Sequence, residues 1–295
     1  MTPEKPTRQL TASERLNFLL TNRLPRRWLT LAMGRFSKIR HPLLARLSIR
    51  VWQMFVDDLR LHEARKTSFD SLHDCFIREL KPDARTINAE SSTLISPCDA
   101  VVGAFGALNE LVAIQAKGFP YQIDELLGDP RAAERYRNGS FLTLRLKSSM
   151  YHRFHAPLDA NVGSVTYLSG DTWNVNPVAL KVIERLFCRN ERVAMELHPN
   201  DCDAPITLVA VAAILVASVR LHGLREPLNL EYAGPNRIEL SRQLCKGDEI
   251  GYFEHGSTIV LLTPGDFRFE AGLASGNTVR MGQPLMRLPS HARNQ

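Results

Sequence analysis

Apolar residues recur at helical spacing in the N-terminal quarter of the chain. In residues 42–61 an apolar side chain returns every three or four positions, as expected for one face of a helix. These positions are Leu43, Leu47, Val51, Met54, Phe55 and Leu59, and the arginines among them are Arg46, Arg50 and Arg60. Residues 24–36 repeat the pattern over a shorter stretch and contain Trp28. Both segments are predicted to be basic amphipathic helices.

The pattern changes further along the chain. Residues 68–80 have the features of a capped helix, with Ser68 or Asp70 near its start and Pro82 closing it. From residue 91 onward, short β-like runs alternate with Gly, Pro, Asn and Asp. The runs are LISPCDAVVGAF, ELVAIQAK, SFLTLRL, ANVGSVTYL, APITLVAVAAILVASV, DEIGYF, STIVLL and PLMRL. Helical patches are expected only at residues 123–127 and 178–187.

These patterns predict an α+β protein. A basic amphipathic helical region at residues 1–66 is followed by a β-rich domain at residues 67–295, built of mainly antiparallel sheets. The composition agrees with a globular fold, because 44% of the 295 residues are hydrophobic and 23% are charged. The five cysteines are scattered and form no CxxC pair, which argues against a disulfide framework or a structural zinc site and favours a reducing compartment.

The positive charge is concentrated in the helical region. Residues 1–66 hold 14 Lys/Arg against 5 Asp/Glu, whereas the whole chain carries a net charge of only +6. Basic amphipathic helices suit an anionic membrane surface, where each Lys or Arg contributes about 1 kcal/mol. A helical hairpin packed on the protein's own core is the alternative, and both can hold for different faces. Nucleic acid is not expected, because basic and aromatic residues do not interleave as in the known binding modules.

Membrane attachment is expected to be peripheral. The longest apolar run, residues 206–219, has 14 residues and falls short of the ~20 that span a bilayer. Its β-branched residues indicate one or two buried strands instead. Residues 1–20 are polar and mixed in charge, unlike a secretory signal.

Four polar positions stand out against the apolar background. They are Asp99, the pair His152 and His155, the triplet Asn190-Glu191-Arg192, and Ser257. Two histidines at i and i+3 can bind a metal on one helical face. Pro157 and the strand-like residues 141–146 argue against a helix there, and no third ligand has recognisable spacing, so no metal is expected.

Ser257 directly follows Gly256, between a polar turn-like stretch and an apolar run. A serine in this place can attack the carbonyl before it, since glycine leaves the approach open. The alternative is an ordinary turn entering a strand. Aspartate, histidine and serine in this chain order also form a nucleophilic triad. However, an α/β-hydrolase needs a GxSxG elbow, and the sequence here lacks the second glycine.

Several ordered motifs together resemble the phosphatidylserine decarboxylases of the prokaryotic type I class, enzymes that make a pyruvoyl cofactor from their own chain. The resemblance covers about residues 76–288 and rests on FIRELKPDAR, SPCDAVVG, KGFPYQIDELLGD, YHRFHAPLD, the turn at residues 175–177, LFCRNERV and KGDEIGYFEHGSTIVLL. Three positions depart from the common family pattern, namely Thr86, Ala100 and His255. None of the three removes a reacting atom.

The resemblance implies a proenzyme that is cut between Gly256 and Ser257 into a β chain of residues 1–256 and an α chain of residues 257–295. His155, oriented by Asp99, would take the proton of Ser257, and the serine oxygen would attack the Gly256 carbonyl. Ser257 would then be converted into the pyruvoyl cofactor. His152 would be the acid that returns a proton after CO2 leaves.

By the same resemblance, the substrate would be phosphatidylserine and the product phosphatidylethanolamine. The enzyme would be a homodimer bound peripherally to the cytoplasmic side of the cell (inner) membrane. Two other functions stay open from the residues alone. One is a membrane-associated binding protein that keeps the fold without cleavage, and the other is a Ser-His-Asp lipid hydrolase.

Overall fold

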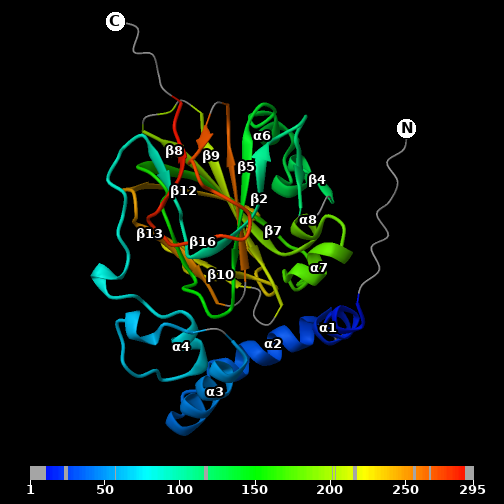
Figure 1. Ribbon diagram of the computed structural model, residues 1–295, viewed down its shortest axis with the longest axis vertical. Helices are drawn as coiled ribbons and strands as arrows, with labels where there is room; N and C mark the ends of the chain where they lie inside the picture. Colours follow the sequence, from blue (N-terminus) through cyan, green and yellow to red (C-terminus); the bar gives the residue numbers. More distant parts are fainter. Residues whose placement is uncertain are drawn as a thin grey trace, which may run out of the picture.

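A computed structural model describes residues 11–22, 26–56, 58–115, 119–200, 202, 204–214, 218–254, 257–265 and 267–289. Its N-terminal helices lie along one side of a β-rich body (Figure 1). They are α1 (Ala12–Asn22), α2 (Arg26–Ser37) and α3 (Pro42–Phe55). Three short helices follow: η1 (Leu61–Glu63), α4 (Leu72–Phe76) and η2 (Pro82–Ala84). None of the described helices is long and apolar enough to cross a membrane.

The helices differ in length from the predicted ones. Helix α3 ends at Phe55 rather than continuing to residue 61, and Leu59 is buried in the connection that follows. There the carboxylate of Asp58 accepts a hydrogen bond from Arg60 N at 2.8 Å, a local turn that competes with the helix. Helix α4 is likewise shorter than residues 68–80, and its N-cap is Ser71, whose hydroxyl accepts from Asp74 N at 3.0 Å. Helix α1 was not predicted.

The central element is an eight-stranded sheet. Its strands, in spatial order, are β12 (Arg237–Leu244), β7 (Ala160–Leu168), β8 (Arg192–Pro199), β9 (Ile206–Ala212), β14 (Ser257–Thr263), β5 (Ser140–Leu146), β2 (Ala100–Ala107) and β16 (Thr278–Val279). Neighbouring strands run antiparallel at each of these pairings. The prediction of a helical N-terminal region followed by a β-rich part with mainly antiparallel sheets is therefore confirmed.

Smaller sheets and helices cover the two faces of the central sheet. One face carries a four-stranded sheet of β11 (Leu228–Asn229), β10 (Ser218–Leu221), β13 (Glu249–Phe253) and β6 (Arg153–His155), and a three-stranded sheet of β1 (Thr93–Ile95), β17 (Pro284–Arg287) and β15 (Arg268–Phe269). The other face carries α5 (Ile123–Leu127), α6 (Pro130–Glu134), α7 (Pro177–Val182) and α8 (Leu186–Arg189), with the hairpin of β3 (Val112–Ile114) and β4 (Pro120–Gln122).

Strand β14 lies near the middle of the central sheet and is buried on both faces. Ile259 and Leu261 point into the core shared with the smaller sheets, whereas Val260 and Leu262 point into the core beneath α5–α8. Successive side chains of a strand point to opposite faces, so the uninterrupted apolar residues 259–262 supply both cores in turn. The strand that begins with Ser257 is thus held on each side by hydrogen-bonded neighbours and on each face by packing.

Seven of the described strands escaped the prediction, namely the two long strands β8 and β12 and the short strands β4, β6, β11, β15 and β16. Strand β8 contains Ala194, Met195 and Glu196, residues that favour helices, and adopts a strand because β7 and β9 pair with it on both sides. Strand β12 lies at the sheet edge and is mostly exposed, so it lacks an apolar signal. The apolar run at residues 206–219 does form two strands, β9 and β10, as expected.

Candidate active site

Ser257 is the first residue of β14 and pairs with Leu146 of β5 and Ala212 of β9. Its side chain is fully buried, and its hydroxyl has no hydrogen-bond partner within the described part of the chain. A buried hydroxyl left without a partner costs about 1–3 kcal/mol. Thr258 and Thr263 of the same strand share this feature, so it is the position directly after Gly256 that distinguishes Ser257. His255 and Gly256, and with them the predicted scissile bond, lie outside the described residues.

His152 and His155 lie in a segment that is hydrogen-bonded to β13, the strand that precedes Ser257 in the chain. Strand β13 pairs with β6, which places His155 opposite Glu249. The carbonyl of His152 accepts a hydrogen bond from Phe253 N at 3.0 Å, four residues before Ser257. Their backbone is extended, so the two rings do not share a helical face. The described residues contain no group of three or more His, Cys, Asp or Glu able to hold a metal ion.

His155 is held as a neutral base. Its Nδ1 lies 2.8 Å from the carbonyl oxygen of Gly247, which can only accept, so Nδ1 carries the proton. Nε2 is therefore unprotonated and accepts from the hydroxyl of Tyr151 at 3.0 Å. Burial lowers the pKa of His155, and the carboxylates of Glu249 and Asp99 oppose this only in part. The ring is thus available to take a proton at Nε2.

His152 is fully buried. Its Nδ1 lies 2.8 Å from the carbonyl oxygen of Met150, which can only accept, so Nδ1 carries a proton. The ring lies against Phe76 of α4, with the ring centres 4.0 Å apart. Because Nδ1 is committed to Met150, Nε2 is the ring atom that can gain and release a second proton. Helix α4 packs directly on this ring and so connects the helical region with the site.

Asp99 is buried next to β2 and faces a cation. Arg85 donates from Nε to one carboxylate oxygen at 2.8 Å and from Nη2 to the other, and Met281 N adds a third hydrogen bond at 3.0 Å. Arg85 also contacts Glu63 at 2.8 Å. No hydrogen bond among the described atoms joins Asp99, His155 and Ser257 to one another. In this structure Gly247 and Tyr151 orient His155, and Asp99 acts on it only through charge.

Several neighbours of the predicted residues were not identified from the sequence. Arg85, Tyr151, Gly247 and Phe76 all contact a predicted site residue. Tyr151 directly precedes His152, and Arg85 ends the FIRELKPDAR motif, so the motifs contained a signal. Gly247 contributes a backbone carbonyl, which no residue pattern can reveal.

The Asn190-Glu191-Arg192 triplet lies one strand away from Ser257. Asn190 Nδ2 donates to the carbonyl of Ala212 at 2.9 Å, and Ala212 N donates to the carbonyl of Glu191 at 2.8 Å, where Ala212 is the residue that pairs with Ser257. The buried guanidinium of Arg192 donates to the carbonyls of Glu125, Leu126, Cys188 and Asn190. Those carbonyls lie in or next to α5 and α8. Carbonyls at the ends of helices have no N–H donor within the helix, and Arg192 supplies donors to them. Its polar character reflects support of the helices that cover β14.

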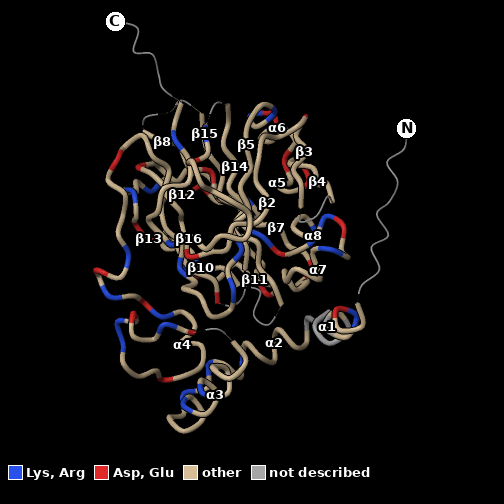
Figure 2. Tube along the Cα trace, viewed as in Figure 1, with Lys and Arg blue, Asp and Glu red and all other residues tan. Residues whose placement is uncertain are grey.

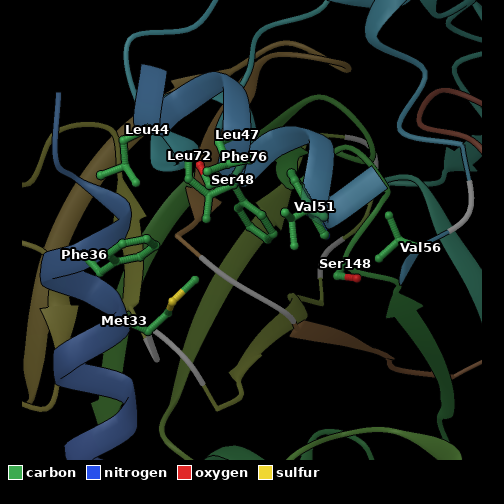
Figure 3. Close-up of a pocket in the computed structure, with 11 residues that line it drawn as sticks. Met33, Phe36, Leu44, Leu47, Ser48, Val51, Val56, Leu72, Phe76 and Ser148 are labelled. Atoms are coloured by element: carbon green, nitrogen blue, oxygen red, sulfur yellow. The ribbon is translucent and has the colours of Figure 1, made fainter. Parts of the chain in front are cut away.

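Three cavities adjoin one another around the loop at residues 147–149. Ser257 lines the middle one, which has a volume of about 550 Å³. An apolar cavity of about 510 Å³ shares Val56 and Ser148 with it and lies between α2, α3 and α4 (Figure 3). A polar cavity of about 450 Å³, lined by Asp99 and Arg85, shares Lys147 and Ser149 with the middle one. The cavity that Ser257 lines thus has an apolar neighbour on one side and a polar neighbour on the other.

Comparison with known proteins gives one consistent result. The family model described as phosphatidylserine decarboxylase matches residues 72–287. Phosphatidylserine decarboxylase proenzyme from Brevibacillus brevis is 34% identical over 271 residues, which cover 90% of this chain and 95% of that protein. The proteins of the same name from Saccharophagus degradans and Legionella pneumophila are 36% and 33% identical, covering 78% and 89% of this chain and 82% and 94% of their own.

Proposed function

Because this chain belongs to the phosphatidylserine decarboxylase family, we propose that it is a proenzyme that cuts itself between Gly256 and Ser257 and then converts phosphatidylserine to phosphatidylethanolamine and CO2. The observation that carries the proposal is the buried hydroxyl of Ser257, directly after Gly256, which has no hydrogen-bond partner among the described residues. A turn serine would be exposed to water, whereas a nucleophile is better served by a desolvated position on a rigid strand.

The cleavage needs one base and no external reactant except water. His155 Nε2 takes the proton of Ser257 Oγ, and Oγ bonds to the Gly256 carbonyl carbon. The bond from that carbon to Ser257 N then breaks and the nitrogen receives the proton, so an ester replaces the amide. Loss of the Ser257 Cα proton to a base, with rupture of the Ser257 Cβ–Oγ bond, forms the Cα=Cβ double bond of dehydroalanine, and Oγ leaves as part of the Gly256 carboxylate. Addition of water and loss of ammonia produce the pyruvoyl group at position 257.

The residues around Ser257 suit such a group. Pairing with Leu146 and Ala212 would fix it at the start of β14, and the adjoining cavity of about 550 Å³ would admit the substrate headgroup. The carbonyl of a pyruvoyl group takes up the substrate amine and accepts electrons as CO2 leaves. His152 would hold the proton that returns to the substrate carbon, on the Nε2 side of its ring.

The apolar cavity suits the acyl chains of a phospholipid. Met33 and Phe36 of α2, Leu44, Leu47 and Val51 of α3, and Leu72 and Phe76 of α4 line it, as Figure 3 shows. Burying acyl carbons there would contribute about 0.8 kcal/mol per CH₂ group. Because this cavity meets the Ser257 cavity at Ser148, a lipid with its tails between the helices would present its headgroup to β14.

The outer face of α3 suits a membrane surface. Leu43, Met54 and Phe55 are 69%, 77% and 81% exposed, and Trp28 of α2 is 78% exposed. Arginines of the same helix stand beside them (Figure 2). Exposed apolar residues rimmed by cations favour peripheral binding to an anionic leaflet, and we place the protein on the cytoplasmic side of the cell membrane. The opposite face of α3 is packed inward at Ala45, so packing on the protein itself accounts for one face of this helix and leaves the other face for the proposed membrane contact.

Intact mass spectrometry of the purified protein tests the proposal. We expect two chains, residues 1–256 and residues 257–295, the second beginning with a pyruvoyl group. Ser257→Ala should give a single chain of 33.2 kDa and no CO2 release from phosphatidylserine vesicles. Thr263→Val is the matched control, since Thr263 lies at the other end of β14 with a buried hydroxyl that also lacks a described partner.

Each rival function predicts a different result. A binding protein without cleavage would leave the wild-type chain whole. A Ser-His-Asp hydrolase would react at Ser257 with a fluorophosphonate, whereas a chain that begins with a pyruvoyl group has no serine hydroxyl left to label. Cleaved, active Ser257→Ala protein would disprove the assignment of the nucleophile.

A further inference from the structure

A buried ion cluster lies directly ahead of the predicted cleavage site. Glu254 follows β13 and precedes Ser257 by three residues, and it is only 3% exposed. Lys38 Nζ lies 3.2 Å from each of its carboxylate oxygens, and His73 Nε2 lies 3.1 Å from one of them. Lys38 comes directly after α2, and His73 belongs to α4. Both partners therefore come from the helical region, 216 and 181 residues away along the chain.

The cluster holds Glu254 in its charged form. Burial alone would raise the pKa of Glu254, but the hydrogen bond from His73 and the charge of Lys38 outweigh burial and lower the pKa to about 2. A buried carboxylate is tolerated only with such partners, and breaking a buried pair leaves an uncompensated charge. The attraction thus fastens α2 and α4 to this point of the β-rich body.

The backbone around Glu254 is fixed from the other side as well. Glu254 N donates to the carbonyl of Ser218 at 3.0 Å, and Phe253 N donates to His152 at 3.0 Å. Ser257 is held by its pairing with Leu146 and Ala212. Only residues 255 and 256 therefore separate the anchors Glu254 and Ser257, and the three Cα-to-Cα steps between these anchors span at most roughly 11 Å. If one anchor were loosened, the Gly256 carbonyl could take up a wider range of positions relative to Ser257.

We propose that Glu254 is a positioning residue for self-cleavage, held by Lys38 and His73, so that the chain is cut efficiently only when α2 and α4 are docked on the β-rich body. This inference rests on the proposed function, since it concerns the same cleavage. Attack by Ser257 Oγ requires the Gly256 carbonyl within a narrow range of distance and direction, and a misplacement of about 1 Å can slow a reaction about a hundredfold. Helix α4 contributes twice, because its Phe76 also packs on His152.

The rate of cleavage in freshly synthesised full-length chains tests this inference. Cell-free translation with a labelled amino acid, followed by denaturing gels over time, measures how fast the precursor disappears. We expect Glu254→Gln to slow cleavage about tenfold and Lys38→Met to slow it several-fold, in line with the usual strength of coupled pairs. The double variant should be no slower than Glu254→Gln alone, because both changes break the same interaction.

Arg35→Gln is the matched control. Arg35 lies one turn before Lys38, and its ion pair with Glu231 at 3.6 Å joins two exposed side chains, 73% and 62% accessible. The substitution Arg35→Gln removes a positive charge from the same end of α2 as Lys38 and leaves the contacts of Glu254 unchanged. We expect cleavage of this variant at the wild-type rate, whereas an effect equal to that of Lys38→Met would attribute the slowing to general charge and overturn the inference.

Two further measurements separate positioning from mere structure. Slow variants that have finished cleavage should keep the wild-type kcat for decarboxylation per mole of α chain, because Glu254 acts before the cofactor exists. Only their KM should rise, since α2 and α4 also line the apolar cavity. Neutral hydroxylamine, which cuts esters and spares amides, should not speed the cleavage of Glu254→Gln if the variant stalls before the ester forms. Release of the fragment by hydroxylamine would place the defect after the ester and contradict the proposal.

The outcomes distinguish the inference from the function on which it rests. A wild-type chain that is never cut removes the proposed function itself. A wild-type chain that is cut, with Glu254→Gln and Lys38→Met cut equally fast, removes only the role of the cluster. Since Lys38 is 48% exposed, Lys38→Met keeps the test decisive even if Glu254→Gln does not fold.

Discussion

The β-rich body and the helical region each depart from the usual placement of side chains, because the body buries polar groups and the helical region exposes large apolar ones. In the body, Ser257 and His152 are fully buried within an apolar core. In the helical region, Met54 and Phe55 extend into solvent. Polar groups are normally outside and large apolar groups inside, so each exception indicates a function. The buried polar groups suit chemistry away from water, and the exposed apolar groups suit contact with lipid.

The two regions also differ in how firmly they are held. Strand β14 pairs with β5 and β9 along its whole length and packs into both cores. Helix α3 presents a single buried residue, Ala45, and meets its neighbours mostly across a cavity. The proposed chemistry, which needs a fixed geometry, would thus take place where the chain is most constrained. The proposed contact with a membrane surface would fall to the part with the least packing.

Exchange of the two histidines for glutamine is expected to have the largest effect within the body. His155→Gln should leave the precursor whole, because no base takes the Ser257 proton. His152→Gln should allow cleavage but lower CO2 release by about 10²–10⁴-fold, the usual contribution of a general acid. Denaturing gels and a CO2 assay on the same samples measure both steps. Loss of cleavage in His152→Gln would show that the two roles have been divided wrongly.

Truncation of one apolar side chain in each region compares their packing. Leu261 is fully buried in β14, so Leu261→Ala should lower the free energy of unfolding by about 2–5 kcal/mol. Met54→Ala should change it by less than about 0.5 kcal/mol, because the side chain is already in water. Urea unfolding in the uncut Ser257→Ala background keeps the chain continuous during the measurement. Equal losses would mean that α3 is covered in solution.

Acidic substitution of the outer face of α3 tests the membrane contact. Leu43→Glu with Met54→Glu should weaken binding to phosphatidylserine vesicles at least tenfold, since it removes apolar burial and adds repulsion. Ile114→Glu controls for the added acid, because Ile114 is also exposed but lies on β3. Vesicle co-sedimentation measures the binding. Unchanged vesicle binding of the double variant would mean that a face other than the outer face of α3 contacts the membrane.

The pH dependence of the cleavage rate is expected to reflect the burial of His155. This is the smallest of the four effects predicted here. Burial lowers the pKa of His155 from its ordinary value of 6.5, so the ring stays neutral and basic below that pH. Precursor cleavage should therefore persist at pH values where an exposed histidine is already protonated. The same shift makes the unfolded chain bind the proton more readily, so this contribution to stability declines as the pH falls below 6.5. A midpoint at or above 6.5 in the rate profile would contradict a buried base.

Local patterns predicted most of the elements, and tertiary pairing accounts for the misses. Helices α2 and α3 and strands β9 and β14 were expected because their periodicity or apolar content is strong. Strand β8 was missed because its helix-favouring residues become a strand only between β7 and β9. The early end of α3 depends on a side-chain contact at Asp58, which a periodicity of apolar residues does not contain.

Ordered motifs in the sequence by themselves determined the family, the α+β class and the residue types at the site, because the reacting atoms belong to particular side chains. Only the tertiary structure decided the protonation and orientation of those side chains. The proton on His155 depends on a backbone carbonyl of Gly247, Asp99 turns to Arg85, and Glu254 is joined to Lys38 and His73 across the fold. These contacts link residues distant in the chain, and burial, which sets their strength, exists only once the chain has folded.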